Sequence, residues 1–302
     1  MHVTPEISIS NRFQTWWLAI RPRTLPAAAA GVVAGSALAL HDRTFHLLPA
    51  LAALSVALLL QIGSNLANDV FDYERGADSG PRHGPLRVTQ SGLLTPPQVK
   101  AGMLLVFALA GLVGLYLAFS AGWVLLLVGV AAIFSAILYT GGPFPLGYYG
   151  LGDLFVFLFF GVACVAGTYF VQAGRVTSAA WWMSLPVGLI IVGLLVVNNL
   201  RDLETDRLAG KHTLAVLLGG RFAKIEYLLC LLVAFLCLPV LSAFGVLSWW
   251  SLLAWITLPL AWKLTRIVFT QKERALNAAL AGSGQLALAF SLLFLLGMLF
   301  AV

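Results

Sequence analysis

Two clusters of carboxylates stand at the ends of apolar stretches of this chain. They hold seven of the twelve acidic residues, and the candidates for metal binding among them are Asp69, Asp72, Asp78, Asp202 and Asp206. Carboxylate oxygens without His or Cys select hard cations, chiefly Mg²⁺. Protein-bound Mg²⁺ usually takes one or two carboxylates and shares the phosphates of a substrate. The clusters therefore predict a site for Mg²⁺ and a diphosphate.

Each cluster also carries an amide four residues before a carboxylate. Asn68 precedes Asp72, and Asn198 precedes Asp202, with an offset of 130 residues between the two pairs. Residues four apart lie on the same side of a helix. The pattern predicts an internal duplication of a helical unit, with Asn198, Asp202 and Asp206 in a row along one helix.

Basic residues near the clusters are candidate donors to a phosphate. Lys211 follows the second cluster, Arg87 follows the first, and Arg23 precedes the first apolar stretch. Cationic N–H groups form strong, charge-assisted hydrogen bonds to phosphate oxygens. The long loop after the first cluster is rich in Gly and Pro, as functional lids often are. We therefore expect the loops in 69–101 and 200–224 to form a cap.

The elements that position these residues are membrane helices. The chain is 60% hydrophobic and 10% charged, against about 25% charged in a soluble domain. Continuous apolar runs of about 20 residues predict spanning helices and exclude a membrane barrel. We expect one all-α membrane domain over 1–302, a bundle of nine transmembrane helices. The expected spans are 24–41, 47–68, 102–120, 122–140, 150–171, 179–199, 225–244, 247–269 and 277–300.

The positive charges predict the orientation of this bundle. Only Arg43 and Arg175, of 18 Lys and Arg residues, fall after an odd-numbered span. Because Lys and Arg concentrate in cytoplasmic loops, we expect a cytoplasmic N-terminus, an outside C-terminus and both acidic clusters on the cytoplasmic side. The net charge of +6 is spread over loops, which argues against nucleic-acid binding.

The two clusters resemble a known pair of motifs. NDVFD at 68–72 and DLETD at 202–206, followed by GKHTL, are similar to the aspartate-rich motifs of UbiA-type intramembrane prenyltransferases. The stretches RPRTLPAA at 21–28, GPLRVTQSG at 84–92 and YTGGPFPLGYYGLGD at 139–153 resemble the branch that prenylates 1,4-dihydroxy-2-naphthoate. The resemblance covers essentially the whole chain and implies nine helices with both motifs facing the cytoplasm.

The resemblance also implies roles for single residues. The implied catalytic residues are Asp72, Asp202, Asp206 and Tyr139, and the implied substrate-binding residues are Asn68, Lys211, Arg87, Asn198, Arg23 and Asp153. The family's next acid falls at Gly76, so Asp78 is expected to replace it. Asp153, an acid at the start of a span, is a candidate for orienting the acceptor or, alternatively, for capping a helix.

The reaction implied is transfer of a polyprenyl group from a polyprenyl diphosphate to 1,4-dihydroxy-2-naphthoate. Carbon dioxide and diphosphate are lost and demethylmenaquinol forms, with Mg²⁺ as cofactor, in the plasma membrane of a bacterium. Other acceptors, such as 4-hydroxybenzoate, homogentisate, a chlorophyllide or haem, stay open. The hydroxybenzoate branch often has a lysine shortly after Tyr139, which GGPFPLG lacks. A secondary transporter is the alternative of another class, although its acids tend to lie at mid-membrane.

Overall fold

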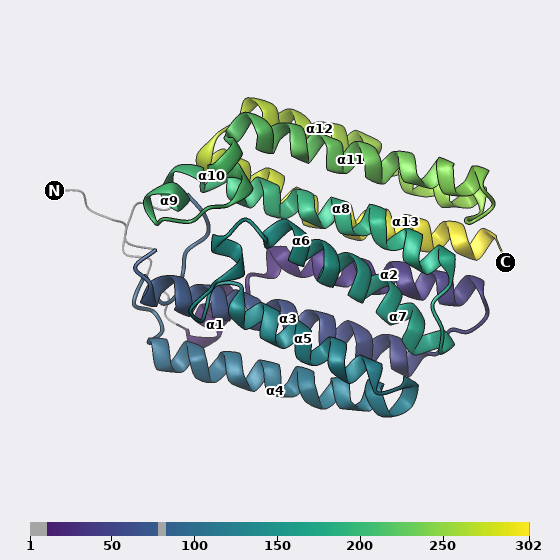
Figure 1. The fold of residues 1–302 in the computed structure, drawn as a ribbon, viewed down its shortest axis with the longest axis horizontal. Helices are drawn as coiled ribbons and strands as arrows, with labels where there is room; N and C mark the ends of the chain where they lie inside the picture. Colours follow the sequence, from purple (N-terminus) through teal and green to yellow (C-terminus); the bar gives the residue numbers. More distant parts are fainter. Residues whose placement is uncertain (1–10, 78–82, 302) are drawn as a thin grey trace.

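The computed structural model describes residues 11–77 and 83–301, and every regular element in these ranges is a helix (Figure 1). The longer helices are α1 (Arg12–Ile20), α2 (Leu25–His41), α3 (Leu47–Glu74), α4 (Pro96–Ala121), α5 (Val124–Leu138), α7 (Cys164–Ala173), α8 (Ser178–Arg201), α11 (Gly220–Ala243), α12 (Leu258–Thr270) and α13 (Asn277–Phe300). Shorter elements are η1 (Pro22–Thr24), η2 (Leu146–Tyr148), α6 (Gly152–Val156), η3 (Phe157–Ala163), α9 (Leu203–Leu208), α10 (Leu214–Leu218), η4 (Trp249–Thr257) and η5 (Glu273–Leu276).

The all-α membrane fold predicted from the sequence is confirmed. Within the described residues, eight helical segments are long and apolar enough to cross a membrane, with α1, η1 and α2 counted as one. The helix α5 is also apolar but has only 15 residues. Every expected span coincides with a helix, while the count of nine crossings and the orientation of the termini stay predictions.

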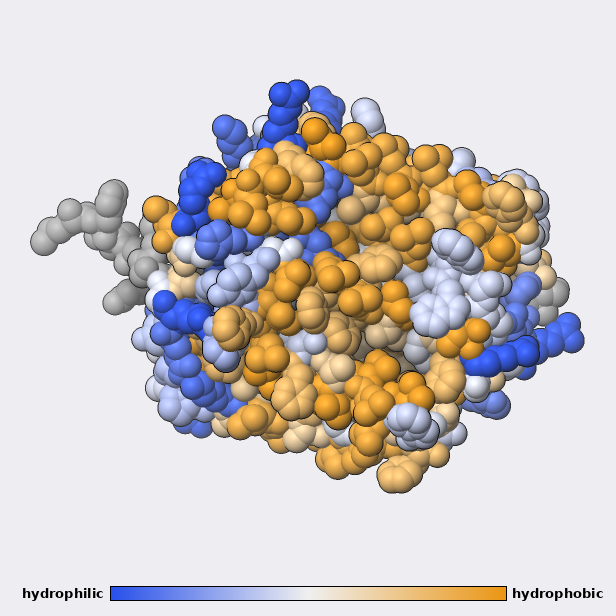
Figure 2. Space-filling view, in the orientation of Figure 1, coloured by the Kyte–Doolittle hydropathy of each residue, from blue (hydrophilic) through white to orange (hydrophobic). Residues whose placement is uncertain are grey.

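The surface of the bundle is apolar around its middle. Figure 2 shows an orange band over the centre of the molecule, with hydrophilic residues gathered at its left and right ends. Large apolar side chains such as Leu112 and Phe134 are 64% and 60% exposed. A soluble protein rarely exposes such an area, so this band fits contact with lipid tails.

Small residues let the helices approach closely at the centre. A Cβ atom added to Gly161 in η3 would lie 2.8 Å from the Cα of Gly188 in α8. Close backbone contact at small residues is typical of helix packing in membranes, where burial of apolar area supplies little driving force. The largest buried core joins α2, α8, α11 and α13, and a second one joins α3 to α4.

The two duplicated helices end differently. The helix α3 continues six residues past its expected end and carries both Asn68 and Asp72. The helix α8 ends at Arg201, so the expectation of one uninterrupted helix from Asn198 to Asp206 was wrong. Asp206 lies in the separate helix α9, beyond a turn at Asp202. The four-residue repeat is nevertheless preserved in the backbone hydrogen bonds. The amide of Asp206 donates to the Asp202 carbonyl (2.7 Å), and the amide of Asp202 donates to the Asn198 carbonyl (3.1 Å).

Candidate active site

A cavity of about 710 Å³ lies inside the bundle and opens among the motif residues. Its walls come from α2, α3, α5, the chain from α6 to α7, α8 and α9. The expected site residues that line it are Asn68, Asp72, Arg87, Tyr139, Asn198, Asp202, Asp206 and Lys211. Residues far apart in the sequence, on both halves of the duplication, therefore meet at one cavity.

Asp72 is a buried carboxylate that meets three donors at this cavity. Its side chain is 2% exposed and accepts hydrogen bonds from Arg87 (2.5 Å) and the Tyr148 hydroxyl (2.7 Å). The Nζ of Lys211 lies 3.3 Å from the same carboxylate. Burying a charge is costly unless it is paired and hydrogen-bonded, and three donors meet that need. Arg87 also donates to the backbone oxygen of Asn68 at 2.6 Å, which fixes its loop against α3.

Asp206 joins the second motif to the same lysine. Its Oδ1 lies 3.4 Å from the Nζ of Lys211, so this lysine bridges the two motifs. Burial raises the pKa of Asp206 to about 6, and the charges of Asp202 and Asp72 add to this effect while Lys211 opposes it. Carboxylates gathered this closely need a counter-charge to be ionised together. The site is therefore suited to a cation held among these acids.

Asp202 is oriented by an arginine that motif spacing alone did not single out. Arg201 is buried, and its Nε donates to Asp202 at 2.8 Å. The same guanidinium donates to the side-chain oxygens of Asn198 and Asn277, each at 2.9 Å. Asn277 in turn donates to the carbonyl of His83 at 2.9 Å. Only the fold reveals this role, because the partner on α13 lies 76 residues further along the chain.

Asp69 does not line the cavity. Its carboxylate accepts the backbone N–H groups of Val88 (3.2 Å) and Thr89 (2.9 Å), and Arg21 lies 3.7 Å away. The reason is helical geometry, since a residue next to Asn68 points about 100° away from it around the helix. Asp69 thus holds the loop that carries Arg87, and the expectation that it is a metal ligand stays a prediction. Asp78 lies outside the described residues.

Two further expected residues also lie off the cavity wall. Arg23 is exposed, while Arg21, two residues earlier, does line the cavity. Asp153 lies in the first turn of α6, and Leu151 occupies the N-cap position of that helix. Within the part of the chain that the structure describes, one buried oxygen of Asp153 has no hydrogen-bond partner. Arg23 and Asp153 are thus two expected substrate-binding residues that do not line the cavity.

Tyr139 follows α5 and is held in place by two glycines. A Cβ atom at Gly147 would lie 2.8 Å from the Tyr139 ring, and one at Gly152 would lie 2.7 Å from its hydroxyl oxygen. Any larger residue at either position would displace the ring. The glycines of YTGGPFPLGYYGLGD therefore set the position of Tyr139 against the cavity.

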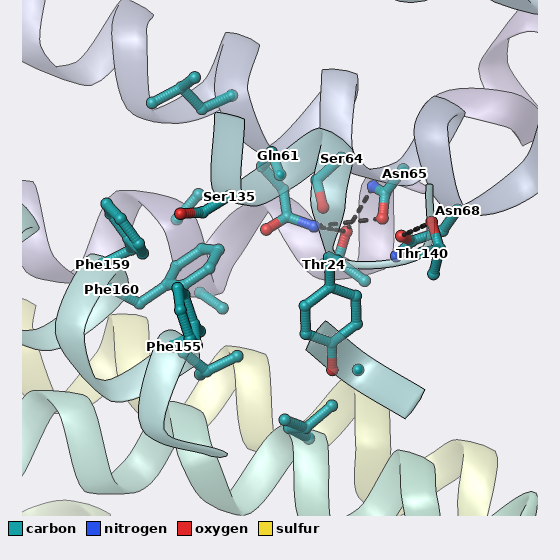
Figure 3. A pocket seen from close by; sticks show the side chains of 18 of the residues that line it. Thr24, Gln61, Ser64, Asn65, Asn68, Ser135, Thr140, Phe155, Phe159 and Phe160 are labelled. Atoms are coloured by element: carbon teal, nitrogen blue, oxygen red, sulfur yellow. Dashed lines mark hydrogen bonds between the residues drawn. The ribbon is translucent and has the colours of Figure 1, made fainter. Parts of the chain in front are cut away.

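The inner part of the cavity has a polar wall and an aromatic wall (Figure 3). The polar wall carries Thr24, Gln61, Ser64, Asn65 and Ser135, and the aromatic wall carries Phe155, Phe159 and Phe160. The aromatic residues lie on α6 and η3, whose π-helical turn widens the helix; such turns frequently occur at functional sites. Polar residues inside an apolar span were the signal in the sequence that could have drawn attention to Gln61 and Asn65.

The donor set fits a metal ion that is shared with a substrate. Among the described residues, no three His, Cys, Asp or Glu side chains are close enough to hold a metal by themselves. Asp72, Asp202 and Asp206 nevertheless face one cavity next to Lys211. Mg²⁺ prefers such an arrangement, with a few carboxylates and the remaining positions filled by phosphate and water.

Comparison with known proteins places the chain in a family. Residues 26–290 match the model of the UbiA prenyltransferase family. The chain is 40% identical over 295 residues to 1,4-dihydroxy-2-naphthoate octaprenyltransferase of Escherichia coli strain K12, covering 95% of this chain and 96% of that one. It is 36% identical over 300 residues to the enzyme of the same name from Haemophilus influenzae, covering 96% and 97%.

The fold is similar to that of a solved family member. A UbiA homologue from Archaeoglobus fulgidus, bound to GPP and Mg²⁺, matches with a TM-score of 0.68 at 14% identity, covering 95% of this chain and 99% of that one. At this identity the likeness concerns the fold. Together with the match over most of the sequence, it leads to one conclusion: the chain belongs to the UbiA prenyltransferase family.

Proposed function

We propose that this protein transfers a polyprenyl group from polyprenyl diphosphate to 1,4-dihydroxy-2-naphthoate in menaquinone biosynthesis. One observation supports it above the others: Lys211 lies between Asp72 of the first motif and Asp206 of the second, at the wall of one cavity. A mixed acidic and basic mouth suits a diphosphate with its cation, and the apolar interior suits an isoprenoid tail. The relatives named for this reaction align over nearly the whole chain.

The charged end of the cavity binds the diphosphate. Asp72, Asp202 and Asp206 would hold Mg²⁺, assisted by the side-chain oxygens of Asn68 and Asn198. When bound, this ion would neutralise charge on the leaving diphosphate, as a Lewis acid does. Lys211 and Arg87 donate hydrogen bonds to phosphate oxygens. Arg201 holds Asp202 in place for this purpose.

The inner end of the cavity performs the carbon chemistry. The bond between C1 of the prenyl chain and the diphosphate oxygen breaks, and its electron pair leaves with the diphosphate. Tyr139 stabilises the allylic cation through its ring face or its hydroxyl oxygen. Phe155, Phe159 and Phe160 exclude water that would quench the cation. The carboxyl-bearing ring carbon attacks C1, and the carboxylate leaves as CO₂, returning its electron pair to the ring.

The setting of the reaction follows from the same features. The enzyme is a multi-pass protein of a bacterial inner membrane, and its charged mouth faces the cytoplasm, in line with the distribution of Lys and Arg. We expect the described parts of 69–101 and 200–224 to form a cap over this mouth. Asp69 supports the cap by accepting the amides of Val88 and Thr89.

The test is prenyl transfer by purified protein in detergent or lipid. Farnesyl or geranylgeranyl diphosphate is offered with 1,4-dihydroxy-2-naphthoate or with 4-hydroxybenzoate, each with Mg²⁺ or with EDTA. The proposal requires a prenylated naphthoquinol that forms only with Mg²⁺ and only from dihydroxynaphthoate. Product from hydroxybenzoate alone would keep the chemistry and reject the acceptor. Absence of any product from folded protein, also with longer donors, would reject prenyl transfer.

A further inference from the structure

Three polar atoms on the inner wall of the cavity have no partner. They are the Oε1 of Gln61 and the hydroxyl oxygens of Ser64 and Ser135, and none makes a hydrogen bond to any residue in 11–77 or 83–301. All three side chains line the cavity, on α3 and α5. Figure 3 shows Gln61 and Ser64 on the wall opposite Phe155 and Phe160. The three residues are half-buried and their polar atoms face the cavity, so a molecule that fills this part of the cavity has to supply hydrogen-bond partners for them.

The orientation of the Gln61 amide follows from a chain of hydrogen bonds that begins at the backbone. The Thr24 hydroxyl donates to the carbonyl of Arg21 at 3.0 Å, so its oxygen is left as an acceptor. The Nδ2 of Asn65 donates to the carbonyl of Ile20 (2.8 Å) and to Thr24 (3.0 Å), which leaves the Oδ1 of Asn65 as an acceptor. Carbonyl oxygens only accept. Each amide therefore has one possible orientation.

Gln61 meets two acceptors and must present its NH₂ group to both. Its Nε2 donates to Thr24 Oγ1 and to Asn65 Oδ1, each at 3.2 Å. Both amide protons are used, and the Oε1 of Gln61 is turned away from Thr24 towards the side of the cavity that holds Ser135 (Figure 3). This oxygen can only accept a hydrogen bond. Its partner has to be a donor, which a prenyl tail cannot supply.

A planar phenol can form hydrogen bonds with the polar wall and pack against the aromatic wall opposite. Its hydroxyl supplies the proton that Gln61 requires, while the serine hydroxyls can donate to or accept from a second hydroxyl and can donate to a carboxylate. Its ring faces match the edges and faces of Phe155, Phe159 and Phe160. Gln61 lies seven residues, about 10 Å, along α3 from Asn68. A bicyclic ring at Gln61 therefore reaches back towards the diphosphate end, where the reacting prenyl carbon lies.

We infer that Gln61, Ser64 and Ser135 form the subsite for the hydroxylated aromatic acceptor, with Gln61 Oε1 accepting a hydrogen bond from a ring hydroxyl. This inference rests on the proposed function and names the side chains that select and orient the acceptor. Thr24 and Asn65 act through Gln61 by fixing its amide. The three phenylalanines pack on the ring. The prenyl tail then lies elsewhere along the apolar part of the cavity.

The test compares steady-state constants for both substrates in matched variants. Ser64→Ala and Ser135→Ala each remove one hydroxyl that has no protein partner, and Gln61→Leu removes the amide. Ser55→Ala is the control, because Ser55 lies on the same helix, bonds only to the Leu51 carbonyl and does not line the cavity. Thermal unfolding of each variant is recorded as well, since Gln61→Leu also breaks the bonds to Thr24 and Asn65.

The inference predicts a rise in the KM for dihydroxynaphthoate of about two- to tenfold for each serine variant, the usual effect of one lost hydrogen bond. It predicts a larger rise for Gln61→Leu and no change in the KM for prenyl diphosphate. Ser55→Ala matches the wild type. Unchanged acceptor KM in both serine variants would overturn the inference, as would a change confined to the prenyl diphosphate. Failure of the proposed function is distinguishable, because the wild type would then form no product.

Discussion

The Nζ of Lys211 lies 3.3 Å from a carboxylate oxygen of Asp72, although 139 positions separate the two residues. The same nitrogen lies 3.4 Å from Asp206. One lysine thus contacts both acidic motifs. A bound diphosphate would replace one of the two carboxylates as the partner of Lys211. The ammonium group would then stay paired with a negative charge both with and without substrate.

Replacing Lys211 with methionine removes that bridge and a phosphate donor. Charge-assisted hydrogen bonds contribute about 1.5–3 kcal/mol, so kcat/KM for prenyl diphosphate should fall by about 10- to 100-fold. The matched control is Lys100→Met, because Lys100 does not line the cavity and contacts Glu74 (2.6 Å) and the ring face of Phe71. Steady-state kinetics of both variants provide the test, and equal effects would argue against a specific role for Lys211.

Tyr148 positions Asp72 through its hydroxyl. Tyr148→Phe keeps the ring and removes the 2.7 Å hydrogen bond to the carboxylate, so we expect kcat/KM to fall by about three- to tenfold. The neighbouring Tyr149 is 54% exposed, and Tyr149→Phe should leave the rate unchanged. If Tyr148→Phe has wild-type kinetics, the hydroxyl does not help to hold Asp72 for catalysis.

We expect Asp69 to stabilise the cap and not to bind the metal. Asp69→Asn weakens the hydrogen bonds that the carboxylate accepts from the Val88 and Thr89 amides. Loss of a buried acceptor lowers the free energy of unfolding by about 1–3 kcal/mol. Thermal unfolding in detergent should therefore shift to lower temperature, while the Mg²⁺ concentration at half-maximal rate stays unchanged. A higher Mg²⁺ requirement without a loss of stability would return Asp69 to the set of metal ligands.

The raised pKa of Asp206 predicts how Mg²⁺ use depends on pH. With a pKa of about 6 this carboxyl carries a proton in acid and loses it as the pH rises. A metal must displace that proton below pH 6, so the half-saturating Mg²⁺ concentration should rise by up to about tenfold for each pH unit below that value. Mg²⁺-dependent binding of geranyl diphosphate gives the readout.

The control for this pH dependence is Asp206→Asn, which cannot titrate at that position. Any pH dependence of the half-saturating Mg²⁺ concentration that remains in this variant reports the protonation of the diphosphate itself. The difference between wild type and variant then belongs to Asp206. Identical pH profiles for the two proteins would contradict a role for Asp206 in holding the cation.

Helical periodicity predicted which motif residues lie together at the cavity. The four-residue spacing of Asn68 with Asp72 and of Asn198 with Asp202 placed all four side chains at the cavity, because helix geometry alone fixes which residues share a side. The apolar runs likewise predicted the helices, since spanning segments must satisfy their backbone internally.

The remaining features depend on contacts between distant segments. The contacts of Asp69 depend on the path of the loop through Val88 and Thr89. The role of Arg201 requires Asn277 on α13. The role of Gln61 depends on Thr24 and Asn65, because their hydrogen bonds set the orientation of its amide group. Spacing along one helix contains none of this information.

The central claim is that the two motifs act as one Mg²⁺-dependent diphosphate site, and Asp72 tests it most directly. Prenyl transfer to dihydroxynaphthoate is measured for the wild type, for Asp72→Asn and for Glu74→Gln, an exposed acid on the same helix that does not line the cavity. We predict a loss of about 100-fold or more for Asp72→Asn, no product with EDTA, and wild-type rates for Glu74→Gln. Mg²⁺-dependent turnover at the wild-type rate in folded Asp72→Asn protein would contradict the account.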